Sequence, residues 1–118
     1  MKETNEFVMA IDTSNYTTSI AIVDYNQNII KDERKTLRVK QGERGLRQSH
    51  ALFQHLENLP LLIENALFDI DNKNIKAIAV SDRPRPAEGS YMPVFKAGLT
   101  IGSVIASSLS IPLFKFSH

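Results

Sequence analysis

Phe7-Val8-Met9-Ala10-Ile11, a continuous apolar run that ends at Asp12, is the stretch of sequence that decides the fold. A short run with no polar residue is typical of a strand that is buried on both faces of a sheet. The residues after Asp12 have the polar composition of a turn, and Thr18-Ser19-Ile20-Ala21-Ile22-Val23 is rich in strand-forming side chains. The pattern therefore predicts two neighbouring strands, with an aspartate at the end of the first.

The residues that follow predict one more strand and then a helix, because the spacing of their apolar residues changes. Residues 25–28 have the composition of a hairpin turn, and residues 29–39 predict a third, more polar strand at or near an edge. From Ser49 the apolar residues recur at spacings of three and four, which predicts a helix. Pro60 lies inside this pattern and is expected to kink the helix or to split it. The predicted buried face consists of Leu52, Phe53, Leu56, Leu59, Ile63, Ala66 and Leu67.

The second half of the chain alternates between strand and helix patterns. Residues 75–80 predict a fourth strand, residues 81–91 a loop, and residues 111–116 a fifth strand. Between the loop and the last strand, Ser90 is a suitable cap for a second helix that runs to about residue 109. The order βββαβαβ predicts an α/β fold in which helices pack on a five-stranded mixed sheet.

Composition and charge limit the kind of protein. The chain has 118 residues, of which 42% are hydrophobic, and this is enough for a single domain. Its net charge is +1 and it has no long basic run, so the sequence does not support sequence-independent binding of nucleic acid by this segment alone. Because there is no cysteine, disulfides, thiolate metal sites and cysteine nucleophiles are excluded.

The apolar segments do not predict a membrane protein. Residues 94–109 are too short and too polar to span a bilayer, which takes roughly 20 apolar residues. Gly98, Gly102 and Ala106 are spaced by four, and they favour close packing of the second helix on the sheet over a membrane dimer motif. The polar N-terminus lacks the pattern of a secretory signal, so we expect a cytoplasmic protein.

Asp12 is the first candidate for chemistry. It precedes the turn Thr13-Ser14-Asn15-Tyr16-Thr17, whose hydroxyl and backbone N–H groups can contact phosphate, while the carboxylate can hold a metal ion or water. A simpler interpretation, which the residues alone favour, is that Asp12 accepts hydrogen bonds from N–H groups of its own turn.

The remaining ionisable residues give weaker indications. His50 and His55 lie five residues apart in the predicted helix, so a shared metal is not expected and both are interpreted as structural or surface residues. His118 follows the fifth predicted strand, where α/β proteins place functional groups, but the sequence shows no metal partner for it. Arg83 and Arg85 can bind an anion or remain solvated.

Several segments together resemble the TsaD/YgjD family, once called O-sialoglycoprotein endopeptidase or glycoprotease. The resemblance begins at Ala10-Ile11-Asp12-Thr13-Ser14 and Thr18-Ser19-Ile20-Ala21-Ile22, and it includes the helix around His55. It continues through Ile78-Ala79-Val80-Ser81 and Ala97-Gly98-Leu99 to the segment Ile111-Pro112-Leu113-Phe114-Lys115-Phe116-Ser117-His118. The match spans nearly the whole chain, and the order and spacing of the segments make it specific.

The resemblance implies a ribonuclease H-like, actin-like ATPase fold of two lobes. Residues 1–118 would be the N-terminal lobe, without the second lobe, and this fragment alone is expected to be inactive. The implied activity is transfer of a threonylcarbamoyl group from its adenylate to an adenosine beside the anticodon of tRNA. The implied cofactors are an adenine nucleotide and either iron or zinc. The implied site residues are Asp12 for catalysis, Ser14, Asn15 and Thr17 for the nucleotide, and His118 for the metal.

Two departures from the family pattern favour an alternative. Tyr16 stands where the family has a functional aspartate, and a tyrosine is not ionised near neutral pH. Asp82-Arg83-Pro84-Arg85-Pro86 replaces a Gly-Pro-Gly turn. The alternative is a non-catalytic scaffold or dimerisation lobe of a diverged paralogue, and the historical metalloendopeptidase is a weaker third interpretation. The expected partners are a second copy or a related subunit, with tRNA contacted only through the full-length protein.

Overall fold

The computed structural model describes residues 5–39, 47–84 and 93–117, and in these ranges the elements follow the predicted order. The strands are β1 (Phe7–Asp12), β2 (Thr17–Asp24), β3 (Ile29–Thr36), β4 (Ile75–Arg83) and β5 (Leu113–Ser117). The helices are α1 (Gln48–Leu67) and α2 (Phe95–Leu109), and a short 3-10 helix, Asn72–Asn74, leads into β4.

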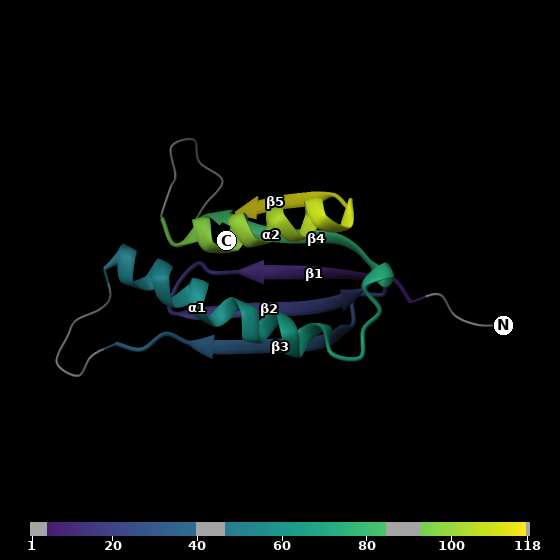
Figure 1. Cartoon of the computed structure of the whole chain (residues 1–118), viewed down its shortest axis with the longest axis horizontal. Coiled ribbons are helices and arrows are strands. Elements are labelled where there is room, and N and C mark those ends of the chain that lie inside the picture. Colours follow the sequence, from purple (N-terminus) through teal and green to yellow (C-terminus); the bar gives the residue numbers. More distant parts are fainter. Residues whose placement is uncertain (1–4, 40–46, 85–92, 118) are drawn as a thin grey trace.

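The strands form one five-stranded sheet in the order β3-β2-β1-β4-β5 (Figure 1). β1 pairs antiparallel with β2 and parallel with β4, and β5 is parallel to β4, so the sheet is mixed as predicted. The apolar run of β1 occupies the middle of the sheet, and the polar β3 lies at an edge. Because β1, β4 and β5 run in the same direction, they end at one side of the sheet, which we call the carboxyl edge.

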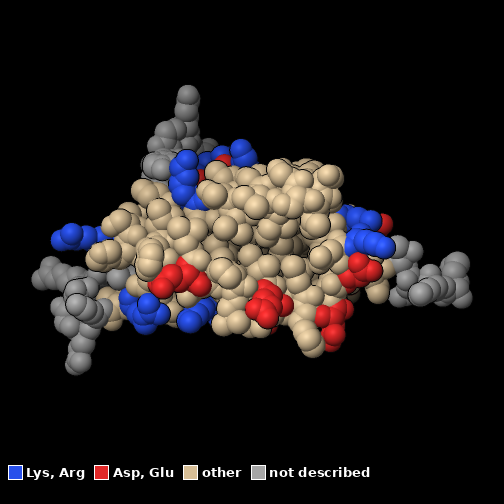
Figure 2. Space-filling model, in the orientation of Figure 1, with Lys and Arg blue, Asp and Glu red and all other residues tan. Residues whose placement is uncertain are grey.

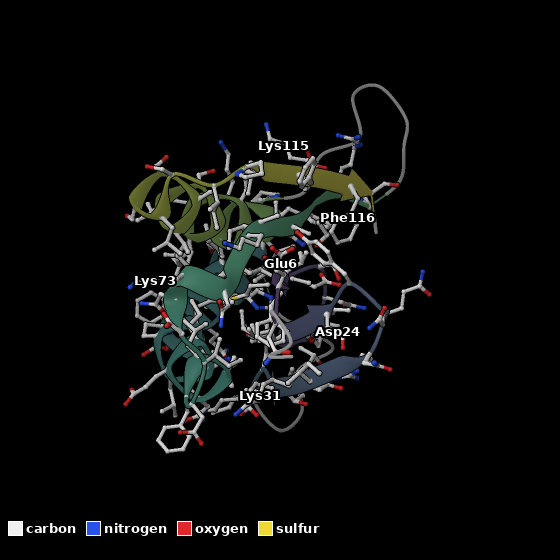
Figure 3. All side chains as sticks on the ribbon, turned by 90° about the vertical axis from the view of Figure 1, so that its right-hand side faces the viewer. Glu6, Asp24, Lys31, Lys73, Lys115 and Phe116 are labelled. Carbon is white, nitrogen blue, oxygen red and sulfur yellow. The ribbon has the colours of Figure 1, made fainter. Side chains whose placement is uncertain are left out.

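Both helices lie on the same side of the sheet, as the end-on view in Figure 3 shows. Side chains alternate along a strand, so every second residue faces these helices. The fully buried core includes Met9, Ile11, Ile20, Ile22, Leu59, Ile78 and Val80. On the opposite face, Val8, Ala10, Ala21 and Val23 are only half-buried. One face of the sheet is therefore packed, and none of the described elements covers the other.

The close packing predicted for α2 is confirmed by its glycines. A Cβ atom at Gly102 would lie 2.6 Å from Cγ1 of Val80, and one at Gly98 would lie 3.1 Å from Oγ1 of Thr13. Both distances are shorter than an ordinary carbon contact. Glycine therefore allows α2 to approach β4 and the end of β1 more closely than any other residue would.

α1 agrees with the prediction in part. It continues through Pro60 as one helix, so of the two outcomes expected at Pro60 the split does not occur. Its buried residues are Ala51, His55, Asn58, Leu59, Leu62 and Ala66, whereas Phe53 and Leu56 of the predicted face are 62% and 40% exposed. With 3.6 residues per turn, this is a rotation of roughly a quarter of a turn away from the apolar face. The rotation occurs because His55 and Asn58 have partners in the sheet, and buried residues on both sides of Pro60 keep the helix in place.

The largest differences from the predicted strand limits are at the ends of β4 and β3. β4 continues to Arg83, beyond the predicted limit at residue 80, because its last residues pair with β5 as far as Ser117. β3 ends earlier than predicted, at Thr36. The predicted cap of α2, Ser90, lies outside the described residues.

On the face drawn in Figure 2, the charged side chains lie toward both ends and along the lower side. The central part of this face is uncharged (Figure 2). Among the described residues, no helix is both long enough and apolar enough to cross a membrane.

Candidate functional site

Asp12 lies at the carboxyl edge, as the last residue of the central strand β1. Its Oδ1 accepts a hydrogen bond from the backbone N–H of Ser14 at 2.9 Å and another from the hydroxyl of Ser81 at 2.8 Å. The bond from Ser14 agrees with the simpler interpretation of Asp12, in which the carboxylate organises its own turn. The bond from Ser81 was not predicted, and it joins the ends of β1 and β4. The side chain stays partly accessible, so a structural role does not prevent contact with a ligand.

Thr13 attaches the same turn to the start of α2. Its buried hydroxyl donates to the carbonyl of Val94 at 2.8 Å and accepts from the backbone N–H of Gly98 at 3.1 Å. The close approach permitted at Gly98 makes these two bonds possible. The turn is thereby fixed against the helix at the first residue after β1.

A buried polar cluster attaches the turn to α1. We call it the His55 cluster, and it consists of His55, Thr18, Asn58 and the backbone carbonyl of Asn15. Nδ1 of His55 lies 2.7 Å from the Thr18 hydroxyl, and Nε2 lies 2.9 Å from the Asn15 oxygen. Asn58 Nδ2 donates to the same hydroxyl at 3.1 Å. Burial lowers the pKa of His55 below its usual value, although the bond to Asn15 and the nearby charge of Asp12 act in the opposite direction.

The last residue of the turn before β2 is also held. The carbonyl of Tyr16 accepts from the backbone N–H of Leu37 at 2.7 Å, which links the turn to the chain beyond β3. The backbone of residues 13–16 is thus connected to both helices, to Asp12 and to the segment after β3. Loops that are fixed in this way lose little conformational freedom when a ligand binds.

The side chains predicted to contact a nucleotide lie on this fixed turn. Ser14 and Thr17 are partly accessible and Asn15 is exposed. Tyr16, the departure from the family pattern, has 43% of its surface exposed and lies between them. The structure therefore brings Asp12, Ser14, Asn15 and Thr17 together at one edge, although no described atom shows what they contact.

β4 adds an acidic residue to this edge that sequence reasoning missed. One carboxylate oxygen of Asp82, Oδ2, pairs with Nη1 of Arg83 at 3.1 Å. The other, Oδ1, is buried and has no hydrogen-bond partner among the described residues. Asp82 lies where the pairing of β4 with β5 is irregular, between Ser81 and Arg83. Arg83 is occupied by this pair, which reduces its suitability as an anion ligand.

His118, the predicted metal ligand, lies outside the described residues. The residue before it, Ser117, ends β5 and pairs with Arg83 at the carboxyl edge. Between β1 and β5 there is only β4, so the two strand ends are separated by roughly 10 Å across the sheet. Within the described residues, no three His, Asp or Glu side chains gather to form a ligand set. These residues by themselves therefore do not fit a metal centre.

The sequence contained weak signals for the His55 cluster, and the structural interpretation of His55 agrees with its full burial. His55 and Asn58 are spaced by three in a helix, and this spacing places them on one face. Thr18 sits in an alternating strand at a position that faces the helices. Both patterns can be read from the sequence. The sequence does not show, however, that the helix face with His55 and Asn58 packs on the strand face with Thr18.

Comparison with known proteins gives both a relative and a fold. The chain is 33% identical over 114 residues to the probable mitochondrial tRNA N6-adenosine threonylcarbamoyltransferase of Caenorhabditis elegans, which covers 94% of this chain and 26% of that protein. YeaZ from Pseudomonas aeruginosa superposes with a TM-score of 0.65 at 17% identity, over 95% of this chain and 44% of that chain. Thermus thermophilus RuvC in complex with a Holliday junction substrate superposes with a TM-score of 0.54 at 12% identity, over 95% of this chain and 64% of that chain. No protein-family model matches the chain.

The two kinds of similarity support different conclusions. At such low identity the solved structures show the fold alone, and they confirm the ribonuclease H-like α/β fold with its five-stranded mixed sheet. The sequence match extends over nearly the whole chain, but the chain spans only 26% of the curated relative. The order of segments, the fold and this match together show that the chain resembles the TsaD/YgjD family, which includes tRNA threonylcarbamoyltransferases.

Proposed function

We propose that the chain is the nucleotide-binding N-terminal lobe of a protein that transfers a threonylcarbamoyl group to adenosine in tRNA. The observation that carries this proposal is the match over 114 residues to a relative whose name describes that activity. The fixed turn after β1, with its accessible hydroxyl and amide groups, supports it independently of the match. Residues 1–118 then form one lobe of a two-lobed protein, and both lobes are needed for activity.

In this proposal the turn between β1 and β2 receives the phosphate groups of an adenine nucleotide. Ser14, Asn15 and Thr17 supply neutral hydrogen-bond donors, which is suitable for phosphate because they add no competing negative charge. Asp12 remains the candidate catalytic group, because its partly accessible carboxylate lies next to Ser14. The tyrosine at position 16 offers a hydroxyl in place of a carboxylate, so it donates to phosphate and does not repel it.

Nucleotide binding can be tested by NMR titration of the chain with magnesium ATP. We expect the amide signals of residues 14–17 to shift, with a dissociation constant of about a millimolar, because one lobe supplies only part of a cleft. Asp12→Asn and Ser14→Ala are expected to change the response, whereas Ser108→Ala, on the exposed side of α2, is a matched control. Tight binding to this chain, or shifts confined to other regions, would contradict the proposal.

The tRNA reaction needs a separate test in the organism that carries the gene. Disruption of the gene is expected to lower the threonylcarbamoyladenosine content of tRNA, measured by mass spectrometry of digested nucleosides. The intact gene should restore the modified nucleoside. Unchanged content after disruption would overturn the proposed reaction and favour a non-catalytic role.

A metal centre of iron or zinc stays a prediction that depends on His118. The described residues supply no complete ligand set, so further ligands must come from outside them. Metal analysis of the purified protein and of its His118→Ala variant provides the test. The prediction requires that the variant loses bound iron or zinc, and equal metal content in both proteins would contradict it.

A second candidate function, a non-catalytic dimerisation lobe, is favoured by the uncovered face of the sheet. On the edge strand β5, Phe114 and Phe116 are 58% and 42% exposed, and their alternation places both on that face. Exposed aromatic side chains of this kind are typical of interaction surfaces. A second copy of the chain is the expected occupant. Sedimentation equilibrium should show dimers that Phe114→Asp weakens, and a strictly monomeric species at high concentration would contradict this role.

A further inference from the structure

We propose that His55 is a positioning residue, which sets the orientation of the Asn15–Tyr16 peptide and thereby the binding geometry of the turn after β1. The inference rests on the proposed nucleotide-binding function and deepens it. His55 itself is fully buried, so it cannot contact a ligand in solution. It acts on the turn through the carbonyl of Asn15, at 2.9 Å from its Nε2.

The hydrogen-bond partners of His55 determine its tautomer. The Asn15 carbonyl can only accept a hydrogen bond, so Nε2 must carry the hydrogen atom. In the neutral ring Nδ1 is then the acceptor, and the Thr18 hydroxyl donates to it. The oxygen of this hydroxyl remains available to accept from Asn58 Nδ2. Each polar atom of the His55 ring therefore has a partner in one neutral form of the ring.

This arrangement has a consequence for the peptide between Asn15 and Tyr16. In a trans peptide the C=O and N–H groups point in opposite directions. The Asn15 oxygen points inward to His55, so the N–H of Tyr16 is directed away from α1. The neighbouring carbonyl of Tyr16 is held by Leu37, which prevents the turn from rotating as a whole. The orientation of a backbone donor in the proposed phosphate-binding turn thus depends on a helix residue 40 positions away in sequence.

Two amide substitutions separate the two contacts of His55. In His55→Gln the side-chain amide reaches the place of Nε2 and can still donate to Asn15, but the acceptor for Thr18 is lost. In His55→Asn the shorter amide can accept from Thr18, but it no longer reaches Asn15. Each variant leaves one buried partner unsatisfied, so the two should lose similar stability in a denaturation experiment.

The experiment measures backbone amide shifts and magnesium ATP affinity of the 118-residue chain by NMR. We expect His55→Asn to shift the amides of residues 14–17 in the free protein and to weaken ATP binding about fivefold or more, while His55→Gln stays within about twofold of the original chain. Thr18→Val is a further control, because it removes the other contact of the ring and keeps Asn15 bound. Equal effects of His55→Asn and His55→Gln on shifts and affinity would overturn the positioning role.

A measurement on the unaltered chain avoids the risk that a variant fails to fold. The ring nitrogen shifts of ¹⁵N-labelled His55 should show hydrogen on Nε2 and none on Nδ1 near neutral pH. The opposite tautomer would contradict the inference, because Nδ1 cannot reach Asn15 in this geometry. If the unaltered chain shows no response to ATP, the nucleotide proposal fails. The tautomer and the amide shifts of the variants then still decide whether His55 orients the turn.

Discussion

α1 and α2 pack on the same face of the sheet, but they do so by different means. α2 uses the absence of side chains at Gly98 and Gly102, which brings its backbone onto Thr13 and Val80. α1 buries two polar residues, His55 and Asn58, which both reach Thr18 in β2. Both helices also hold the turn after β1, α2 through Thr13 and α1 through the carbonyl of Asn15.

The difference shows that one turn can be fixed by two contacts, of which one is sensitive to added atoms and the other to pH. The α2 contact depends on shape and on the two hydrogen bonds of the Thr13 hydroxyl, so it tolerates no added atoms but does not respond to protonation. The α1 contact depends on a buried, neutral imidazole, so it responds to pH. Substitutions on α2 should therefore act through steric overlap, and changes at α1 should act through hydrogen bonds and charge.

The largest effect is expected at the α2 contact. Gly102→Leu places a side chain where even a Cβ atom would be 2.6 Å from Val80, so it should lower the free energy of unfolding by about 3 kcal/mol. Urea denaturation measures this change. Thr100→Leu introduces the same side chain on the exposed side of α2 and should have little effect. A small effect of Gly102→Leu would show that α2 does not depend on this approach.

A smaller effect is expected where α2 meets the turn. Thr13→Val keeps the shape of the side chain but removes the hydroxyl that bonds Val94 and Gly98. Loss of these buried bonds should lower the free energy of unfolding by about 1.5 kcal/mol. Thr36→Val, at the exposed end of β3, is the matched control in the same denaturation experiment. Equal stability of the two variants would mean that Thr13 does not hold the turn to α2.

The smallest effect is expected from the pH dependence of the α1 contact. Burial lowers the pKa of His55 in the folded chain, so the unfolded chain takes up the proton first as the pH falls. The stability that neutral His55 supplies is complete above the unfolded pKa of about 6.5, and it is lost as the pH falls from there toward the folded pKa. The slope of this loss cannot exceed about 1.4 kcal/mol per pH unit.

Denaturation at several pH values between about 8 and 5 tests this dependence. His55→Gln should remove it, because glutamine does not titrate. His50→Gln, at the exposed start of α1, is the matched control. Identical pH profiles for the unaltered chain and His55→Gln would show that α1 and α2 do not differ in this respect.

The contrast between the helices also explains which predictions were right. The spacing of Gly98, Gly102 and Ala106 predicted the packed face of α2, because small residues that are four apart lie on one side of a helix and allow close packing there. The face of α1 was predicted correctly only in part, because Phe53 and Leu56 are apolar and yet exposed, whereas the other predicted residues are buried or pack against the core. The burial of His55 and Asn58 depends on partners about 40 residues away, which no local period can reveal.

The same limit applies to the candidate site. Asp12 and its turn were found from sequence, because a buried strand that ends in an acidic residue and a polar turn is a local pattern. The bond from Ser81 and the buried carboxylate of Asp82 were not found, because β4 was expected to end before them. Its extension depends on pairing with β5, which follows far along the chain.

By itself, the sequence determined the order of strands and helices and the location of the polar turn. These features follow from local periodicity and composition, which act over a few residues. The burial that it predicted for both faces of the first strand is complete on one face only. Only the tertiary structure decided which side of α1 is buried and which groups fix residues 13–16. Those outcomes depend on whether buried polar atoms find partners across the sheet, because a buried polar atom without a partner costs free energy.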